Sequence, residues 1–481
     1  MDASGAITWC SHIVTLCLRQ LALESADRPY RIAAQMDTRL RVVILISLSA
    51  QALSADVLVG GKATVDPHHP PAHMSPVKSD AAQVDLGRSI FEIQWVATGT
   101  PGIAARTGVG PLFNAAACTA CHNRGGQGHG PAGGGQAPVA LVMQLESPPP
   151  DTSAQSDGDP IYGRVFNTSG LDGVRAEGTV TVQYREITGY YYPYGGRWTM
   201  RVPHYHLGGM SRGPLAPHTV IKPRLAPALF GVGLLEAVPE SAITNVAATQ
   251  PDDRTSGTIV WHLRKGRRAV GRFGWQGNSV SIRDQTTNAL AHEMGVSSSD
   301  RSEEDCTPAE ADCLEKCAIG PPEVSDQMLD ALVTFLRTLA VPESPTHVKG
   351  AVSGSELFAD LGCAGCHRPT LPVELPGEGE ARLPGVITPY TDLRLHDLGM
   401  EMADEDASGV RVTSHWRTAP LWGLGYRLRA ENHPTFLHDG RARSTEEAVL
   451  WHGGEAAYAK RKFVNLGPRA RLALLRWLAT L

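Results

Sequence analysis

Apolar side chains recur at helical spacing in several stretches of the chain. After Asp80, residues 84–93 place valine, leucine, isoleucine and phenylalanine on one face of a predicted helix. Two further stretches, residues 332–339 and 472–481, have the same amphipathic character, and each closes one half of the chain. We therefore expect a mainly α-helical protein built from two related halves.

One region alternates with the period of a strand instead. Residues 180–184 alternate between apolar and polar side chains, and residues 198–202 follow a turn rich in Tyr, Gly and Pro. This pattern predicts a β-hairpin. Residues 131–159 are rich in Pro, Gly and Ser and are expected to form a loop. Because the second half has no counterpart, we interpret residues 131–220 as an insertion into the first half.

A five-residue pattern occurs once in each half. Residues 118–122 read Cys-Thr-Ala-Cys-His, and residues 363–367 read Cys-Ala-Gly-Cys-His. At this spacing the two thiols can add to the two vinyl groups of one porphyrin, and the adjacent histidine can reach the iron. The sequence therefore predicts two covalently bound haem c groups, in two cytochrome c-like domains. The predicted attachment residues are Cys118, Cys121, His122, Cys363, Cys366 and His367.

The two halves share further sequence. A Leu-Phe pair stands at the same distance before the first cysteine of each motif, and residues 224–233 resemble residues 417–425 with one residue fewer. Such an internal repeat indicates two domains of related plan. We place the first domain at residues 80–345 and the second at 346–481, with the boundary in the Pro-containing linker 341–347.

The N-terminal residues 1–55 are interpreted as an extension followed by a secretory signal. Arg39 and Arg41 precede the apolar run 42–50, and small residues follow as far as Ala55. We expect Met36 to be the true start, and residues 56–79 to form a leader. The apolar run is too short to span a bilayer, so the mature protein is expected to be periplasmic without a stable membrane span. An uncleaved N-terminal anchor is the alternative.

The net charge limits the kinds of partner that the chain can bind, and the cysteines outside the motifs indicate a disulfide. The 481 residues carry a formal net charge of -5 and no basic stripe, which argues against a nucleic-acid partner. Outside the two motifs, the predicted mature chain has Cys306, Cys313 and Cys317. In an oxidising compartment two of these three are expected to form a small-loop disulfide, and the sequence leaves open which two. A zinc site is the alternative, although no histidine lies nearby at the usual spacing.

The two motifs occur together with five further segments: residues 225–237, 271–275, 388–393, 395–399 and 436–441. On these the sequence resembles the bacterial di-haem cytochrome c peroxidase superfamily. The closest resemblance is to its di-haem oxidoreductase branch, often called thiol oxidoreductases. It covers roughly residues 80–481.

The resemblance implies a catalytic trio. Trp275 matches the tryptophan between the haems, and Gln285, ten residues later, matches the distal glutamine. Glu293, in a Glu-Met-Gly motif, matches the catalytic glutamate, two residues earlier than the peroxidase spacing. A carboxylate or amide above an open iron can move a proton between the oxygens of a peroxide. Plain packing is the alternative for Trp275.

At the second haem the chain departs from the peroxidases. They place an axial methionine fourteen residues after the histidine of a His-Asp-Gly motif, and a related maturation branch uses tyrosine. Counting from His438, this chain has His452. The expected ligands are therefore His367 and His452, with a lower reduction potential than a His/Met pair. A surface histidine at a helix end is the alternative for His452. The predicted iron ligands are His122, His367 and His452.

Other residues are matched by role. Arg417, His438 and Arg441 are expected to contact haem propionates. The candidate sixth ligands of the first haem in a resting state are His129, His204 and His206. Leu225 stands where the peroxidases use an asparagine to bind calcium, which argues against calcium here.

Together these features imply an exported di-haem c-type oxidoreductase of peroxidase type. The first haem would take peroxide or an oxidisable substrate, and the second would transfer electrons from a small periplasmic donor protein. The alternative is a non-catalytic di-haem electron carrier with both irons six-coordinate. Glu293 and Gln285 would have no task in a carrier, and they favour the enzyme.

Overall fold

The computed structural model describes nine stretches of the chain: residues 80–97, 107–147, 158–245, 257–264, 266–302, 305–317, 320–343, 351–376 and 382–481. The predicted extension, signal and leader, and most of the predicted linker, lie outside these residues. All nine stretches belong to one unit, residues 58–481, so the contacts do not separate the two predicted haem domains. Among the described residues, no helix is both long and apolar enough to cross a membrane.

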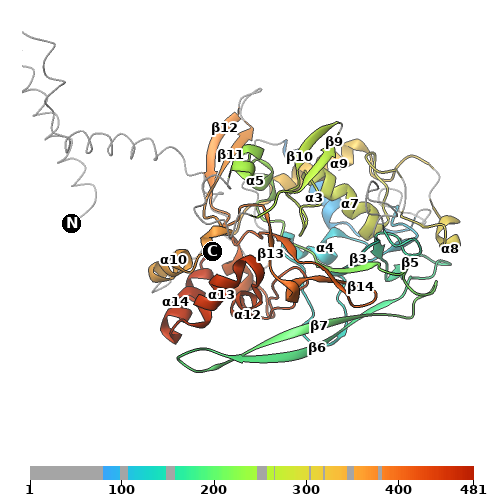
Figure 1. Cartoon of the computed structure of the whole chain (residues 1–481). Coiled ribbons are helices and arrows are strands. Elements are labelled where there is room, and N and C mark those ends of the chain that lie inside the picture. The colour runs from blue at the N-terminus through green and yellow to red at the C-terminus, as the bar shows by residue number, and fades with distance from the viewer. Residues whose placement is uncertain are drawn as a thin grey trace, which may run out of the picture. The chain divides into compact units, whose positions relative to one another are not determined.

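Helices occur throughout both halves of the described chain (Figure 1). They are α3 (Ala81–Glu92), α4 (Cys118–Cys121), α5 (Val232–Glu236), α6 (Glu240–Thr244), α7 (Ile282–Met294), α8 (Ala311–Leu314), α9 (Asp326–Arg337), α10 (Ala351–Asp360), α11 (Leu424–Ala430), α12 (Thr445–Trp451), α13 (Ala457–Val464) and α14 (Pro468–Leu478).

A crossed helix pair is repeated in the two halves. In the first half α3 packs on α9, and in the second α10 packs on α14. Each crossing needs a glycine, because a Cβ atom on Gly87 would meet the Ala331 carbonyl oxygen at 2.0 Å, and one on Gly354 would meet the Ala473 carbonyl oxygen at 2.6 Å. The repeated plan predicted from the sequence is therefore present in the helices.

The prediction of a mainly α-helical fold is wrong. The protein is 31% helix and 25% strand. Its strands are β1 (Leu112–Phe113), β2 (Gly135–Gln136), β3 (Leu141–Glu146), β4 (Val165–Phe166), β5 (Ser169–Gly170), β6 (Thr179–Tyr190), β7 (Arg197–Gly208), β8 (Val220–Leu225), β9 (Trp261–Arg264), β10 (Arg267–Val270), β11 (Leu371–Pro376), β12 (Arg382–Ile387), β13 (Leu395–Asp397), β14 (Asp404–Asp406), β15 (Arg411–Thr413) and β16 (His415–Arg417). Most are short, and several contain Pro or Gly, so the sequence pattern alone predicts loops at these positions.

The largest sheet joins the two halves. Its strand order is β15-β14-β8-β3-β4, so strands of the second half pair with strands of the first. Glu405 pairs with Ile221 in antiparallel register. Next to this pairing the buried Arg224 guanidinium makes two hydrogen bonds of 2.7 Å with the Asp404 carboxylate. Such a bidentate pair fixes the register of the shared sheet.

The predicted hairpin is confirmed, but it is more than an insertion. β6 and β7 pair from Thr179 opposite Gly208 to Tyr190 opposite Arg197. The tip reaches the second half, where the Tyr191 hydroxyl donates to Glu446 at 2.6 Å. β7 contacts α12, and the Arg471 guanidinium of α14 lies 3.4 Å from the centroid of the Tyr191 ring. Figure 1 shows the hairpin below these helices. It therefore connects the two halves.

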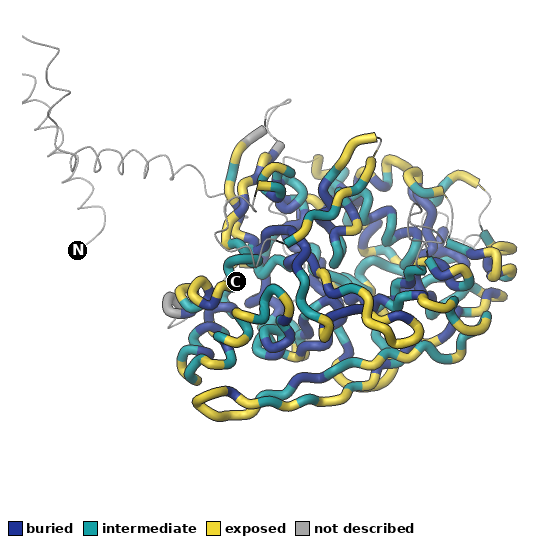
Figure 2. The backbone as a smooth tube through the Cα atoms, in the orientation of Figure 1, coloured by how far each residue is buried: buried dark blue, intermediate teal, exposed yellow. Residues whose placement is uncertain are grey.

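Two large apolar cores lie among the buried segments of Figure 2, and both draw on the two halves: the first includes Leu371 and Val373 of the second half, and the second includes Tyr191 and Met200 of the first. The first is built around α3, α7 and α9, and the second around α10, α12 and α14. A third, smaller core lies between β3, β4 and β8. Cys306 and Cys313 form the predicted disulfide, which settles the pairing left open by the sequence.

Candidate functional site

A cavity of about 410 Å³ lies beside the second Cys-x-x-Cys-His motif. Cys363, Cys366 and His367 form one part of its wall, and His452 lies in another. The volume falls in the range of small-molecule and cofactor sites, about 300–1,000 Å³. The remaining wall is mostly apolar, with Phe358 among its aromatic side chains.

His367 and His452 face each other in this cavity. Their ring centroids are 6.4 Å apart. The Nδ1 atom of His367 donates to the Tyr390 carbonyl at 3.0 Å, and that of His452 donates to the Ala448 carbonyl at 2.7 Å. Each Nε2 atom is therefore left as a lone-pair donor. Two imidazoles on opposite sides of one metal, with bonds of about 2 Å, have centroids about 6 Å apart, so the pair fits a haem iron.

Burial keeps both imidazoles neutral. Burial, and to a smaller extent the neighbouring His452, lowers the pKa of His367 to about 4. Burial also lowers the pKa of His452. A metal ligand must be neutral imidazole, so these shifts suit ligation.

Local sequence positions each histidine. His367 follows a turn that begins after Gly362, whose φ of 88° lets α10 end there. His452 caps the C-terminus of α12, whose N-terminus is capped by the Ser444 side chain accepting from the Glu447 amide. Gly453 and Gly454 follow and let the chain leave the helix at once.

Two of the three predicted propionate contacts line the cavity. Arg417 donates through Nε to the Gly274 carbonyl at 2.8 Å, and among the described residues no carboxylate lies within 4.0 Å of its guanidinium. Burial lowers the pKa of Arg417 to about 10. An unmatched buried cation at the wall suits a carboxylate of the bound group.

His438 stacks on Trp416 with ring centroids 3.6 Å apart, and burial lowers the pKa of His438 well below its usual range. Arg441 is not part of the wall. Its guanidinium pairs with Asp439 at 2.8 Å and lies over the Trp451 ring. The predicted contact of Arg441 with a propionate therefore has no support in this arrangement.

A buried charge triad at the cavity was missed from the sequence. His396 Nε2 lies 2.9 Å from Asp392 and its Nδ1 lies 2.8 Å from Glu455. Burial alone would lower the pKa of His396, but the hydrogen bonds to Asp392, Cys366 and Glu455 raise it to about 12. With Cys366 as a free thiol, an imidazolium thus lies beside this predicted attachment residue. The Leu-His-Asp segment was noted only for its family resemblance, because Glu455 is 59 residues away in sequence.

The first motif lies against the end of α7. The amides of Asn114 and Ala115 donate to the Glu293 carbonyl at 2.8 and 3.1 Å, which positions the segment leading to Cys118. Burial lowers the pKa of His122 to about 4, and its Nδ1 atom is buried without a hydrogen-bond partner. A neutral, buried imidazole next to two thiols is the donor set of a haem c site.

The Glu293 side chain lies beside this motif and is partly buried, with its Oε2 atom fully buried. Its Oε2 atom has no hydrogen-bond partner. Burial, and to a smaller extent the charge of Asp305, raises the pKa of Glu293 to about 8. The Glu293 charge in turn contributes to raising the pKa of Cys121 to about 12, after burial. The carboxyl group of Glu293 therefore holds a proton at neutral pH.

Gln285 lies on the same helix but not at the same point. α7 begins after the Ser281 cap and ends at Gly295, which has a φ of 62°. Eight residues separate Gln285 from Glu293, which is about 12 Å along the helix axis. The structure therefore does not bring the two side chains together.

Trp275 connects the first half to the cavity of the second. Its Nε1 atom donates to the Leu225 carbonyl at 2.7 Å, and its own carbonyl accepts from the Arg417 amide at 2.8 Å. The indole lines the cavity and packs against the core of the second half.

The remaining predicted residues lie as follows. His204 and His206 are on β7, paired with Gln183 and Thr181. His129 is 54% exposed and lies 4.0 Å from Glu431. Leu225, at the calcium position of the resemblance, is fully buried in an apolar core.

Comparison with known proteins gives one family. The family model described as "Di-haem oxidoreductase, putative peroxidase" matches residues 218–481, more than half of the chain. The match includes the second motif and α7 but not residues 118–122. The search of the curated proteins returns no match. Among solved structures, hydrazine synthase of Kuenenia stuttgartiensis, pressurised with xenon at 20 bar, is similar at 12% identity and a TM-score of 0.34. That similarity covers 95% of this chain and 100% of that chain, and at this TM-score it carries no argument.

Proposed function

Because the chain belongs to the di-haem oxidoreductase family, we propose that it is an exported di-haem c-type oxidoreductase of peroxidase type. Its first haem site would take peroxide, which is reduced there, or an oxidisable substrate. Its second transfers electrons received from a small periplasmic donor protein. Export rests on the signal-like residues 36–55 and on the two attachment motifs.

The residues that would hold the two haems are Cys118, Cys121 and His122 for the first, and Cys363, Cys366, His367 and His452 for the second. When bound, the haems supply redox-active iron. Arg417 would balance propionate charge at the second site, and the Asp392–His396–Glu455 triad would hold the wall around Cys366.

The observation that carries the proposal is the difference between the two sites. The cavity of the second motif has a neutral histidine, His367 and His452, on each side, and both would hold an iron bound there. Beside the first motif lies a buried carboxyl group, Glu293, whose Oε2 atom makes no hydrogen bond. Such a group is able to give a proton to a substrate oxygen and take it back. An electron carrier has no use for it.

Trp275 supports the connection between the sites. It belongs to the first half and lines the cavity of the second. Its indole N–H donates to the Leu225 carbonyl, and its own carbonyl accepts from the Arg417 amide. A π-system fixed in this position would shorten the path that an electron takes between the two haems. Gln285 is given an orienting role only, because it lies two helix turns from Glu293.

Turnover with hydrogen peroxide tests the proposal. The purified di-haem protein, supplied with a reduced donor, is expected to oxidise that donor only when peroxide is present. Glu293→Gln keeps the shape but cannot give up its proton, and should lower kcat by about 10²–10³-fold. The exposed Glu374→Gln serves as the matched control and should leave kcat unchanged.

If the wild type shows no peroxide-dependent turnover, the protein is a carrier. If Glu293→Gln turns over like the wild type, the proton-donor role is wrong.

A further inference from the structure

Three cysteines outside the haem motifs have their sulfur atoms close together. Cys306 and Cys313 form a disulfide, and the Cys317 Sγ atom lies 3.1 Å from Cys306 Sγ. All three sulfur atoms lie within 4.8 Å of one another. A thiol in contact with one sulfur of a disulfide is the arrangement from which thiol–disulfide exchange starts.

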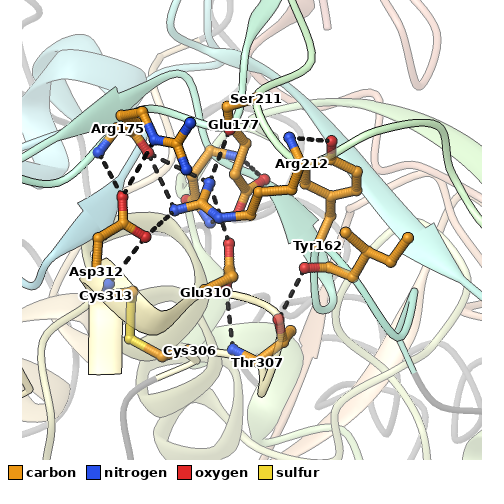
Figure 3. Close-up of polar contacts among 12 residues, drawn as sticks. Tyr162, Arg175, Glu177, Ser211, Arg212, Cys306, Thr307, Glu310, Asp312 and Cys313 are labelled. Carbon is orange, nitrogen blue, oxygen red and sulfur yellow. Dashed lines mark hydrogen bonds and ion pairs between the residues drawn. A yellow bond between two sulfur atoms is a disulfide. The ribbon is translucent and has the colours of Figure 1, made fainter. Parts of the chain in front are cut away.

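The loop between the disulfide partners is held by polar contacts of its own (Figure 3). Near its start, the Thr307 hydroxyl donates to the Ile161 carbonyl at 2.8 Å. Near its end, Asp312 accepts from the Arg212 guanidinium at 2.7 Å and from the Arg175 amide at 2.9 Å.

Glu310, fully buried in the middle of the loop, accepts from the Thr307 amide at 2.9 Å and faces Arg212 at 3.5 Å. These contacts do not involve sulfur. The loop therefore keeps its place when the Cys306–Cys313 bond is opened.

The two ends of the disulfide differ in access. Cys313 is 1% exposed and packs with Leu112 and Val174. Cys306 and Cys317 are both partly exposed. A disulfide between Cys306 and Cys317 would therefore be more open to a reactant from solution than the pair seen here.

We propose that Cys306, Cys313 and Cys317 form a thiol–disulfide exchange site whose substrate class is a dithiol. In the internal step the Cys317 thiolate attacks Cys306 Sγ, the Cys306–Cys313 bond breaks, and Cys313 leaves as a thiolate and takes up a proton. This step neither gains nor loses electrons.

In the external step a dithiol attacks the exposed Cys306–Cys317 bond through a mixed disulfide and leaves as its own disulfide. Two electrons and two protons pass from the dithiol to Cys306 and Cys317. Cys306 is thus the shared sulfur, Cys317 receives the substrate, and Cys313 is the buried leaving group.

Disulfide mapping on the di-haem protein tests the internal step. Samples are quenched in acid, denatured in excess maleimide, digested and analysed by mass spectrometry. Exchange predicts maleimide on both Cys313 and Cys317 in the wild type, because either is the remaining thiol. Cys313→Ser and Cys313→Ala should both form a Cys306–Cys317 disulfide. Maleimide on Cys317 alone in the wild type, or thiols at both positions in the folded Cys313 variants, would overturn the proposal.

The rate of reduction by dithiothreitol tests the external step. Cys317→Ser locks the buried pair and should slow reduction at least tenfold relative to the wild type. Cys313→Ala should be reduced at least as fast as the wild type. Equal rates for the wild type and Cys317→Ser would contradict the relay. Zinc bound in one equivalent by the reduced wild type, with no reoxidation on removal of the dithiol, would show a metal site instead.

Discussion

Individual side chains set the chemistry of each site more than the attachment motifs do. The two Cys-x-x-Cys-His motifs are alike in sequence, yet one faces His452 and the other lies beside Glu293. The motifs could be found from sequence because their chemistry is local. The Asp392–His396–Glu455 triad could not be found in this way, because it needs Glu455. That residue follows α12 and is placed next to His396 only by the fold.

The pH dependence of stability should report on Glu293. Its pKa is raised from 4.5 to about 8 by burial and by Asp305, so the folded state holds a proton that the unfolded state releases. The contribution of this proton to the free energy of unfolding is fully present below pH 4.5 and is lost as the pH rises through 8. Glu293→Gln cannot ionise. It should therefore gain roughly 2 to 4 kcal/mol over the wild type between pH 5 and pH 9, measured by denaturant unfolding at both pH values.

The exposed Glu374→Gln should follow the wild type at both pH values. An equal difference between Glu293→Gln and the wild type at pH 5 and pH 9 would show that the carboxyl group is not buried as described.

At the scale of elements, periodicity found α3, α9, α14 and the hairpin but not their docking. Residues 180–184 alternate clearly enough to predict β6, and α3 and α9 follow their apolar stripes. The short strands β3, β8 and β14 were missed, because three to six residues carry too little pattern and β8 contains Pro223. The hairpin packs against residues that are more than 200 positions away in the sequence, and no local pattern indicates them.

Arg201 is expected to fasten the hairpin. It is 3% exposed, and its guanidinium donates to the carbonyls of Gly440 and Arg441 in the second half and of Pro131 and Ala132 in the first. Arg201→Met keeps the length of the side chain but leaves these carbonyls without donors. The free energy of unfolding should fall by about 3 kcal/mol, measured by chemical denaturation.

Arg197→Met, on the exposed end of the same strand, is the matched control and should change stability by less than about 0.5 kcal/mol. A cost for Arg201→Met no larger than that of the control would mean that the hairpin is not held by this residue.

At the scale of the whole described unit, the two halves are interlocked rather than joined by a linker. They share the sheet β15-β14-β8-β3-β4, and Arg427 of the second half donates to Gln127 of the first at 2.7 Å. The repeat in the sequence indicated two domains of related plan, and the helix pairs follow it. The sequence pattern does not show the shared sheet, because sheet pairing depends on contacts distant in sequence.

Unfolding of the di-haem protein should therefore be a single transition. Because strands of both halves pair in one sheet, neither half can lose its core without exposing that of the other. Differential scanning calorimetry should give one peak, with the calorimetric enthalpy equal to the van't Hoff enthalpy. Two resolved peaks would show that the halves are independent domains.

The central claim is that the two haem sites differ because His452 closes the second. Electronic absorption and electron paramagnetic resonance spectra of the oxidised di-haem protein test it directly, with His452→Ala compared to the wild type and to the exposed His415→Ala. The wild type and the control should show the low-spin signal of a bis-histidine haem, and His452→Ala should convert that signal to high spin while leaving the first haem unchanged. A His452→Ala spectrum identical to that of the wild type would contradict the account.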